Sequence, residues 1–112
     1  MIDQKDKRRF PRISLRAPLR YQIRGVPEFN HAICDNISSG GISFTGEQFI
    51  PTATTLMLEI NVLSRILRPV GKIAWSQSLP HSDRKRLGVE FLELNHVDKN
   101  YLSDYLDMHL SY

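Results

Sequence analysis

Three arginines lie beside one aromatic ring near the start of the chain, in the segment Arg8-Arg9-Phe10-Pro11-Arg12. A guanidinium group is planar and always charged. It binds phosphate oxygens through two N–H groups, pairs with the O6 and N7 edge of guanine and stacks on flat rings. The segment therefore suits a nucleotide ligand. On these residues alone, a solvated basic tail stays open as the alternative.

A second segment of small polar residues and glycine runs through Asn36-Ile37-Ser38-Ser39-Gly40-Gly41. Asn36 and Ser38 alternate, so on a strand they point to the same face, and Gly41 permits either an unusual dihedral angle or close contact. Turns of this composition are common. The segment gains meaning only together with the arginines.

Composition and the distribution of charge indicate one folded domain with a basic N-terminal segment. The chain has 112 residues, of which 41% are hydrophobic and 24% charged, which is typical of one folded domain. Residues 1–24 hold eight basic and two acidic side chains, a net +6, whereas the other residues carry −3. The positive charge is thus concentrated at the start, and residues 1–12 have no period. We expect a mobile basic arm there.

Six short stretches with the period-two alternation of a half-buried strand follow the arm. They cover residues 17–23, 31–37, 41–45, 54–62, 66–76 and 87–92. In the fifth stretch, Pro69 and Gly71 indicate an edge or a bulge near its start. Six short strands, separated by turn signals, predict an all-β domain that is a small antiparallel barrel or sandwich.

The last part of the chain has helical spacing instead. Tyr101, Leu102, Tyr105 and Leu106 recur at helical intervals, and Asn95 is a suitable N-cap. We expect one C-terminal helix whose aromatic stripe packs across an open mouth of the barrel. The predicted organisation is a flexible arm over residues 1–16, a barrel over 17–94 and a helix over 95–112.

Several functional classes lack the residues that they need. Cys34 is the only cysteine, the four histidines have no metal-binding spacing, and no catalytic triad or phosphate-binding glycine loop occurs, so we expect neither an enzyme nor a metal site. No apolar run is long enough for a membrane span and the first residues are charged, which predicts a soluble protein that is not secreted. Trp75 falls in an apolar strand pattern, which favours the core or the barrel wall over stacking on a base.

Three motifs in this order resemble the PilZ domain. They are the Arg-x-x-x-Arg of Arg8 and Arg12, the Asn-x-Ser-x-x-Gly of Asn36, Ser38 and Gly41, and a Gly-Val-Glu-Phe over residues 88–91. The resemblance extends from Lys7 to the terminal helix. PilZ domains are six-stranded antiparallel barrels with a C-terminal helix, and they are bacterial cytoplasmic receptors for cyclic di-GMP.

The resemblance implies a ligand site for cyclic di-GMP in two halves. Arg8 and Arg12 would bind phosphates and guanine edges, with Arg9 as an auxiliary contact. On the barrel, Asn36 and Ser38 would hydrogen-bond a guanine or phosphate, and Gly41 would admit the base. Asn36 stands where the family often has aspartate, so an amide replaces a carboxylate acceptor. No cofactor beyond this ligand is implied.

Binding would order the arm, and the changed surface would signal in trans to an unidentified partner protein, since no output domain is attached. One alternative is a PilZ-like adaptor that binds no ligand and acts by protein contacts in pilus assembly or motility. Another is a small basic barrel that binds RNA or single-stranded DNA. The second requires aromatic residues interleaved along a strand face, and the arm offers only Phe10.

Overall fold

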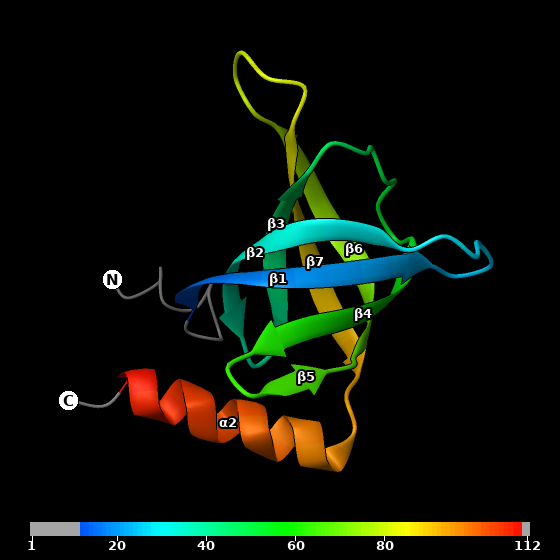
Figure 1. Ribbon diagram of the computed structural model, residues 1–112. Coiled ribbons are helices and arrows are strands. Elements are labelled where there is room, and N and C mark those ends of the chain that lie inside the picture. Colours follow the sequence, from blue (N-terminus) through cyan, green and yellow to red (C-terminus); the bar gives the residue numbers. More distant parts are fainter. Residues whose placement is uncertain (1–11, 111–112) are drawn as a thin grey trace, which may run out of the picture.

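The computed structural model describes residues 12–110, which form an antiparallel barrel and one helix (Figure 1). The elements are β1 (Ile13–Ile23), β2 (Asn30–Ser38), β3 (Gly41–Gly46), β4 (Thr55–Val62), β5 (Arg65–Leu67), β6 (Val70–Ser78), β7 (Lys85–Glu93) and α2 (His96–Leu110). Residues 1–11 of the predicted arm, Arg8 and Arg9 among them, lie outside the described part of the chain.

Six strands close the barrel. Their order is β1-β2-β3-β7-β6-β4, and β4 pairs with β1 to complete the ring, while β5 extends the edge of β4. All the pairings are antiparallel. The prediction of a six-stranded antiparallel barrel with one C-terminal helix is therefore confirmed.

The predicted strand over residues 66–76 is interrupted and forms β5 and β6. Both lie along the same edge of β4: Leu67 pairs with Ile60, and Val70 pairs with Met57, in one continuous register. The break falls at Arg68 and Pro69. Proline has no N–H to donate to a ladder, and the N–H of Arg68 donates instead to Asp98 Oδ2 at 3.0 Å. The expected irregularity near the start of β6 is also present, as a register shift between Val70 and Gly71.

β1 begins at Ile13, four residues before the strand predicted from Ala17. The alternation of Ile13, Leu15 and Ala17 continues the apolar face toward the start of the chain. Ile13 and Leu15 pack against the core, and Ala17 is buried. The intervening Ser14 and Arg16 are exposed. This segment is therefore part of the barrel wall, with one apolar face inward and one polar face outward.

Inward-facing side chains of all six barrel strands fill the interior. The largest fully buried side chains include Phe44, Ile37, Ile42, Leu56, Leu58, Ile60, Ile73 and Leu87. Tyr21 lies against Phe44 with ring centroids 5.2 Å apart. Paired residues and alternate residues of a strand share a face. The residues that lie between these buried ones along each strand therefore point outward.

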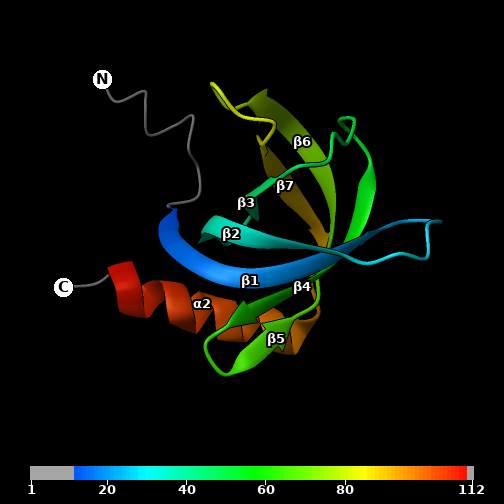
Figure 2. The same ribbon diagram turned by 45° about the horizontal axis from the view of Figure 1, so that its top comes forward.

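Helix α2 lies along the end of the barrel where β5 is found (Figures 1 and 2). Leu102, Tyr105 and Leu106 are buried in the core, and the Tyr101 hydroxyl donates to Val62 O at 2.9 Å. The predicted packing of the aromatic stripe on the barrel is confirmed. No helix in the span 12–110 is long and apolar enough to cross a membrane.

The start of α2 is held by a capping pair and one ion pair. The N–H of Asp98 donates to Asn95 Oδ1 at 2.8 Å, as the predicted N-cap requires. Arg65 Nε lies 2.8 Å from Asp98 Oδ1, and this carboxylate is 2% exposed. Burial opposes its ionisation, but the hydrogen bonds from Arg68 N–H, Arg65 and Asn95 outweigh it and lower the pKa of Asp98.

Candidate ligand-binding site

Arg12 and Asn36 meet at the start of the barrel wall. Arg12 immediately precedes β1, and the antiparallel pairing of Ser14 with Asn36 brings the two ends level. Arg12 Nη1 donates to Asn36 Oδ1 at 2.7 Å. The described end of the Arg-x-x-x-Arg motif is thus in contact with the first residue of the Asn-x-Ser-x-x-Gly motif.

An irregularity in β2 determines where Asn36 points. The register with β3 shifts between Cys34 and Asn36, so Asp35 is an extra residue at that point. Asp35 Oδ2 accepts a hydrogen bond from Thr45 Oγ1 at 2.8 Å and lies 3.7 Å from Arg86 Nε. The one carboxylate adjacent to Asn36 in sequence is therefore already bound by partners of its own, which reduces its repulsion of an anionic ligand.

Ser38 closes the two-residue turn between β2 and β3. Its side chain is 2% exposed. The Ser38 hydroxyl donates to Gly41 O at 3.3 Å and accepts from the N–H of Gly40 at 3.2 Å. The turn is also attached to β7, because Phe91 N–H donates to Gly40 O at 2.8 Å. In this arrangement Ser38 holds the turn rigid beside Asn36.

Gly41 is needed for close packing of backbone against backbone. A Cβ atom at this position would overlap the carbonyl oxygen of Val89 on the paired strand β7. Glycine at this position therefore permits close contact, and not an unusual dihedral angle. The contact is with the backbone of the barrel itself. Its expected part in admitting a base stays a prediction.

A row of paired residues runs outward from Asn36 across four strands. Asn36 pairs with Ser43, Ser43 with Gly88, and Gly88 with Trp75. The adjoining row of Ile37, Ile42, Val89 and Ile73 is buried in the core, so the row from Asn36 to Trp75 lies on the outer face.

Gly88 allows the indole of Trp75 to lie across this row. A Cβ atom on Gly88 would fall on the indole ring. Trp75 is 38% exposed, so it belongs to the barrel wall, as the strand pattern favoured. With strands about 4.8 Å apart, Gly88 lies roughly 10 Å from Asn36. The amide of Asn36 and the exposed indole ring of Trp75 are thus about two strand spacings apart.

Ser43 occupies the middle of the row with its hydroxyl unused. It is 1% exposed, and its Oγ has no hydrogen-bond partner among the described residues. A buried polar group without a partner is costly and is uncommon away from functional sites. Ser43 therefore leaves one hydroxyl unsatisfied by the described residues, beneath the surface between Asn36 and Trp75.

The structure brings together Arg12, Asn36, Ser38 and Gly41, while the predicted contacts of Arg8 and Arg9 fall outside the described residues. Trp75 was not among the predicted ligand residues. Its relation to Asn36 depends on cross-strand register, and the sequence signal is only the glycine of the Gly-Val-Glu-Phe motif.

The described residues contain no cluster that would hold a metal ion. Burial raises the pKa of the Cys34 thiol to about 12, assisted by the charge of Asp35, so this thiol stays protonated.

Six antiparallel strands close this barrel, and one C-terminal helix packs on it. The PilZ domain family model matches residues 6–107, and the chain belongs to this family. No curated protein matches it significantly.

Solved structures share the fold at low identity. The inhibitor of motility MotI/DgrA of Bacillus subtilis has a TM-score of 0.79 and 19% identity, over 89% of this chain and 49% of that one. Escherichia coli YcgR in complex with c-di-GMP has a TM-score of 0.77 and 14% identity, over 92% and 46%. This chain therefore spans about half the length of these two proteins. The PilZ domain of YcgR with c-di-GMP has a TM-score of 0.69 and 14% identity, over 91% and 90%.

Proposed function

We propose that this chain is a cyclic di-GMP receptor that binds its ligand on the outer barrel face between Arg12 and Trp75. The observation that carries the proposal is the contact of Arg12 with Asn36, which joins the two motifs into one site. The PilZ neighbours solved with c-di-GMP support the choice of ligand. We further propose a binding role without catalysis and a cytoplasmic location, where this second messenger is found.

The chemistry of each group fits one part of the ligand. The Arg12 guanidinium supplies a forked donor for a phosphate or for the O6 and N7 edge of guanine. Asn36 offers both an amide oxygen that accepts from guanine N–H groups and an amide nitrogen that donates. Trp75 offers a flat, partly exposed ring for stacking on a base.

Arg8 and Arg9 complete this proposal from the start of the chain. Residues 1–24 carry a net +6, which suits a ligand with two phosphates. We propose that binding orders the arm on the barrel. Fixing about ten residues at roughly 1–2 kcal/mol each opposes binding, while each charge-assisted hydrogen bond contributes about 1.5–3 kcal/mol. Affinity should therefore be moderate and decrease with salt.

The output of such a receptor is a changed surface. An arm brought onto β1 and β2 presents different groups to another protein, which is a disorder-to-order switch acting in trans. The proposed downstream partner is a protein that binds differently to the barrel with the arm bound and to the barrel without it.

Titration calorimetry with cyclic di-GMP tests the site. We expect wild type to bind and Arg12→Ala to bind about 10-fold to 100-fold more weakly, the loss expected for one charge-assisted contact. Arg24→Ala is the matched control, since Arg24 is exposed at the opposite end of β1. Absence of heat with wild type, or equal affinity for both variants, would contradict the proposal.

A further inference from the structure

The barrel wall has an opening at the end opposite the turn of Ser38. β2 begins at Asn30, but its pairing with β3 covers only Ile33 to Ser38. Beyond Thr45 and Gly46 the chain leaves the wall, and no described strand pairs with Asn30, His31 and Ala32 on that side. Three residues of β2 thus have a strand on one edge only.

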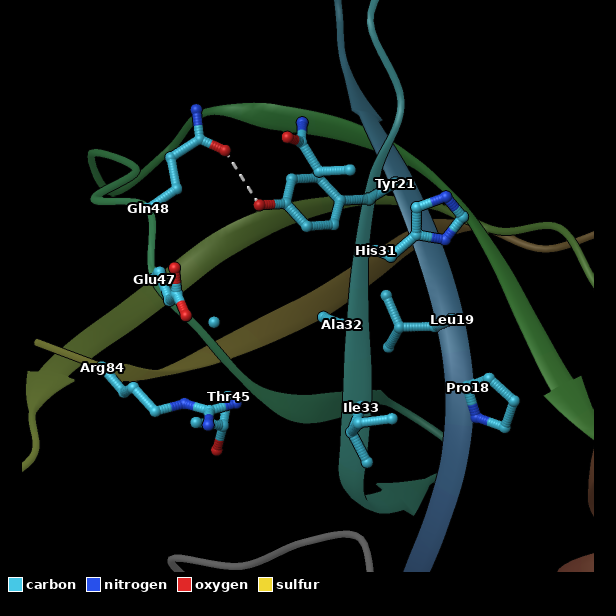
Figure 3. Close-up of a pocket in the computed structure, with 12 residues that line it drawn as sticks. Pro18, Leu19, Tyr21, His31, Ala32, Ile33, Thr45, Glu47, Gln48 and Arg84 are labelled. Carbon is cyan, nitrogen blue, oxygen red and sulfur yellow. Dashed lines mark hydrogen bonds between the residues drawn. The ribbon is translucent and has the colours of Figure 1, made fainter.

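The opening lies between β2 and the beginning of β7. Before it diverges, β3 lies between β2 and β7, with Gly46 paired to Lys85. Where β3 leaves, no described strand lies between β2 and the beginning of β7. A cavity of about 750 Å³ fills this place, with His31 and Ile33 on one side and Glu47 and Arg84 on the other (Figure 3).

Backbone polarity points into the opening. Pro18 pairs with Ile33 and has no N–H, and the ladder of β1 with β4 starts at Leu19, the residue after Pro18. These facts make Pro18–Ile33 a non-hydrogen-bonded pair of the β1–β2 ladder, because hydrogen-bonded and non-hydrogen-bonded pairs alternate. Arg20–His31 is then also non-hydrogen-bonded. The N–H and C=O of His31 therefore face away from β1, toward the opening.

The side chains around the opening favour an alternating occupant with an acidic group. Leu19, Tyr21 and Ala32 form the floor toward the barrel interior, and Tyr21 is held by a 3.0 Å hydrogen bond from its hydroxyl to Gln48 Oε1. Arg84 is exposed and forms no ion pair with any residue in the described range. Glu47 lies on the same side of the opening, and Arg84 is the lining residue there that offers a positive charge unpaired within residues 12–110.

We infer that this opening receives an extended segment of a partner protein. The segment pairs with the free edge of β2 as a strand, in the position that β3 would occupy if it continued. Main-chain hydrogen bonds to His31 provide the attachment. An apolar side chain of the segment faces Leu19 and Ala32, and an acidic side chain reaches Arg84. The site is separate from the proposed nucleotide site, which lies at the other end of β2.

Fluorescence polarisation with labelled hexapeptides tests this inference. The probes alternate glutamate with valine, leucine or tyrosine. Each probe has two control peptides. In one, the backbone amides along one edge of the extended peptide are N-methylated, and in the other, lysine replaces glutamate. We expect at least one acidic probe to bind below 1 mM, with both control peptides at least 10-fold weaker. No binding by any acidic probe, or equal binding of the N-methylated control, would overturn the inference, and the latter would indicate a pocket for small molecules.

A matched pair of variants isolates the backbone contact. His31→Pro removes the imidazole together with the N–H that faces the opening, whereas His31→Ala removes the imidazole and keeps the N–H. We expect a loss of at least 10-fold for the first and less than 2-fold for the second. In wild type, probe binding should shift the amide resonance of His31, a readout that does not require His31→Pro to fold. An unshifted His31 resonance under saturating probe would also overturn the inference.

Discussion

Arg12 Nη1 lies 2.7 Å from Asn36 Oδ1, although 24 positions separate the two residues in the chain. The contact follows from the register of β1 and β2, in which Ser14 pairs with Asn36. A donor that leads into the arm and an acceptor on the barrel are therefore held together by the ladder itself. Whatever binds at Asn36 meets the guanidinium of Arg12 at the same time.

Replacing Asn36 by aspartate should tighten cyclic di-GMP binding by about 3-fold to 10-fold. A carboxylate accepts charge-assisted hydrogen bonds from guanine N–H groups, which are stronger than those to an amide oxygen. Calorimetry at fixed salt gives the comparison. Ser14→Asp is the control, because it places a carboxylate on the adjacent strand at the paired position. If both variants weaken binding alike, Asn36 lies near phosphates and is not a guanine acceptor.

Gly41→Ala should destabilise the barrel by about 3 kcal/mol, because its Cβ would overlap Val89 O and backbone atoms have little room to move. Gly46→Ala is the matched control on the same strand, since its Cβ would meet only the Phe44 ring at 3.6 Å. Urea unfolding of the two variants measures the difference. Equal stability would show that β3 and β7 are less closely packed at Gly41 than described.

Gly88→Ala should displace the indole of Trp75 and weaken cyclic di-GMP binding by about 5-fold or more, the loss expected when a stacking ring moves. Trp75 is the only tryptophan, so its emission reports the displacement in the same sample. Trp75→Phe, which keeps a smaller flat ring, should retain most of the affinity. Shifted emission with unchanged affinity would remove Trp75 from the site.

The sequence predicts the local features of this fold well and the long-range ones poorly. Alternation locates the strands, and Asn95 marks the start of α2, because these signals lie within one element. The break at Arg68 and Pro69 is only partly visible, since it also depends on Asp98, 30 positions away. The place of Trp75 beside the site requires the register of four strands, which no local pattern contains.

Asp98→Asn should lower stability by about 2 kcal/mol at pH 7, because it removes the charge from hydrogen bonds with Arg65 and Arg68 N–H. Since the folded-state pKa of Asp98 lies below its ordinary value, its ionised form stabilises the fold above about pH 4. That contribution is lost as pH falls through the folded pKa. Urea unfolding between pH 7 and pH 3 should therefore be less pH-dependent for Asp98→Asn than for wild type.

Asp104→Asn is the control for this pair of measurements, because Asp104 is exposed on the same helix. It should keep the stability and the pH dependence of wild type. An identical acid response of Asp98→Asn and wild type would show that the link between α2 and β5 does not depend on the charge of Asp98.

Amide and indole chemical-shift mapping during a titration with cyclic di-GMP tests the proposed site most directly. The account predicts the largest changes at Arg12, at residues 36–41 and at the indole N–H of Trp75, with little change in residues 24–32 at the other end of β2. Binding that leaves residues 36–41 and the indole unmoved, or no binding at millimolar ligand, would contradict it.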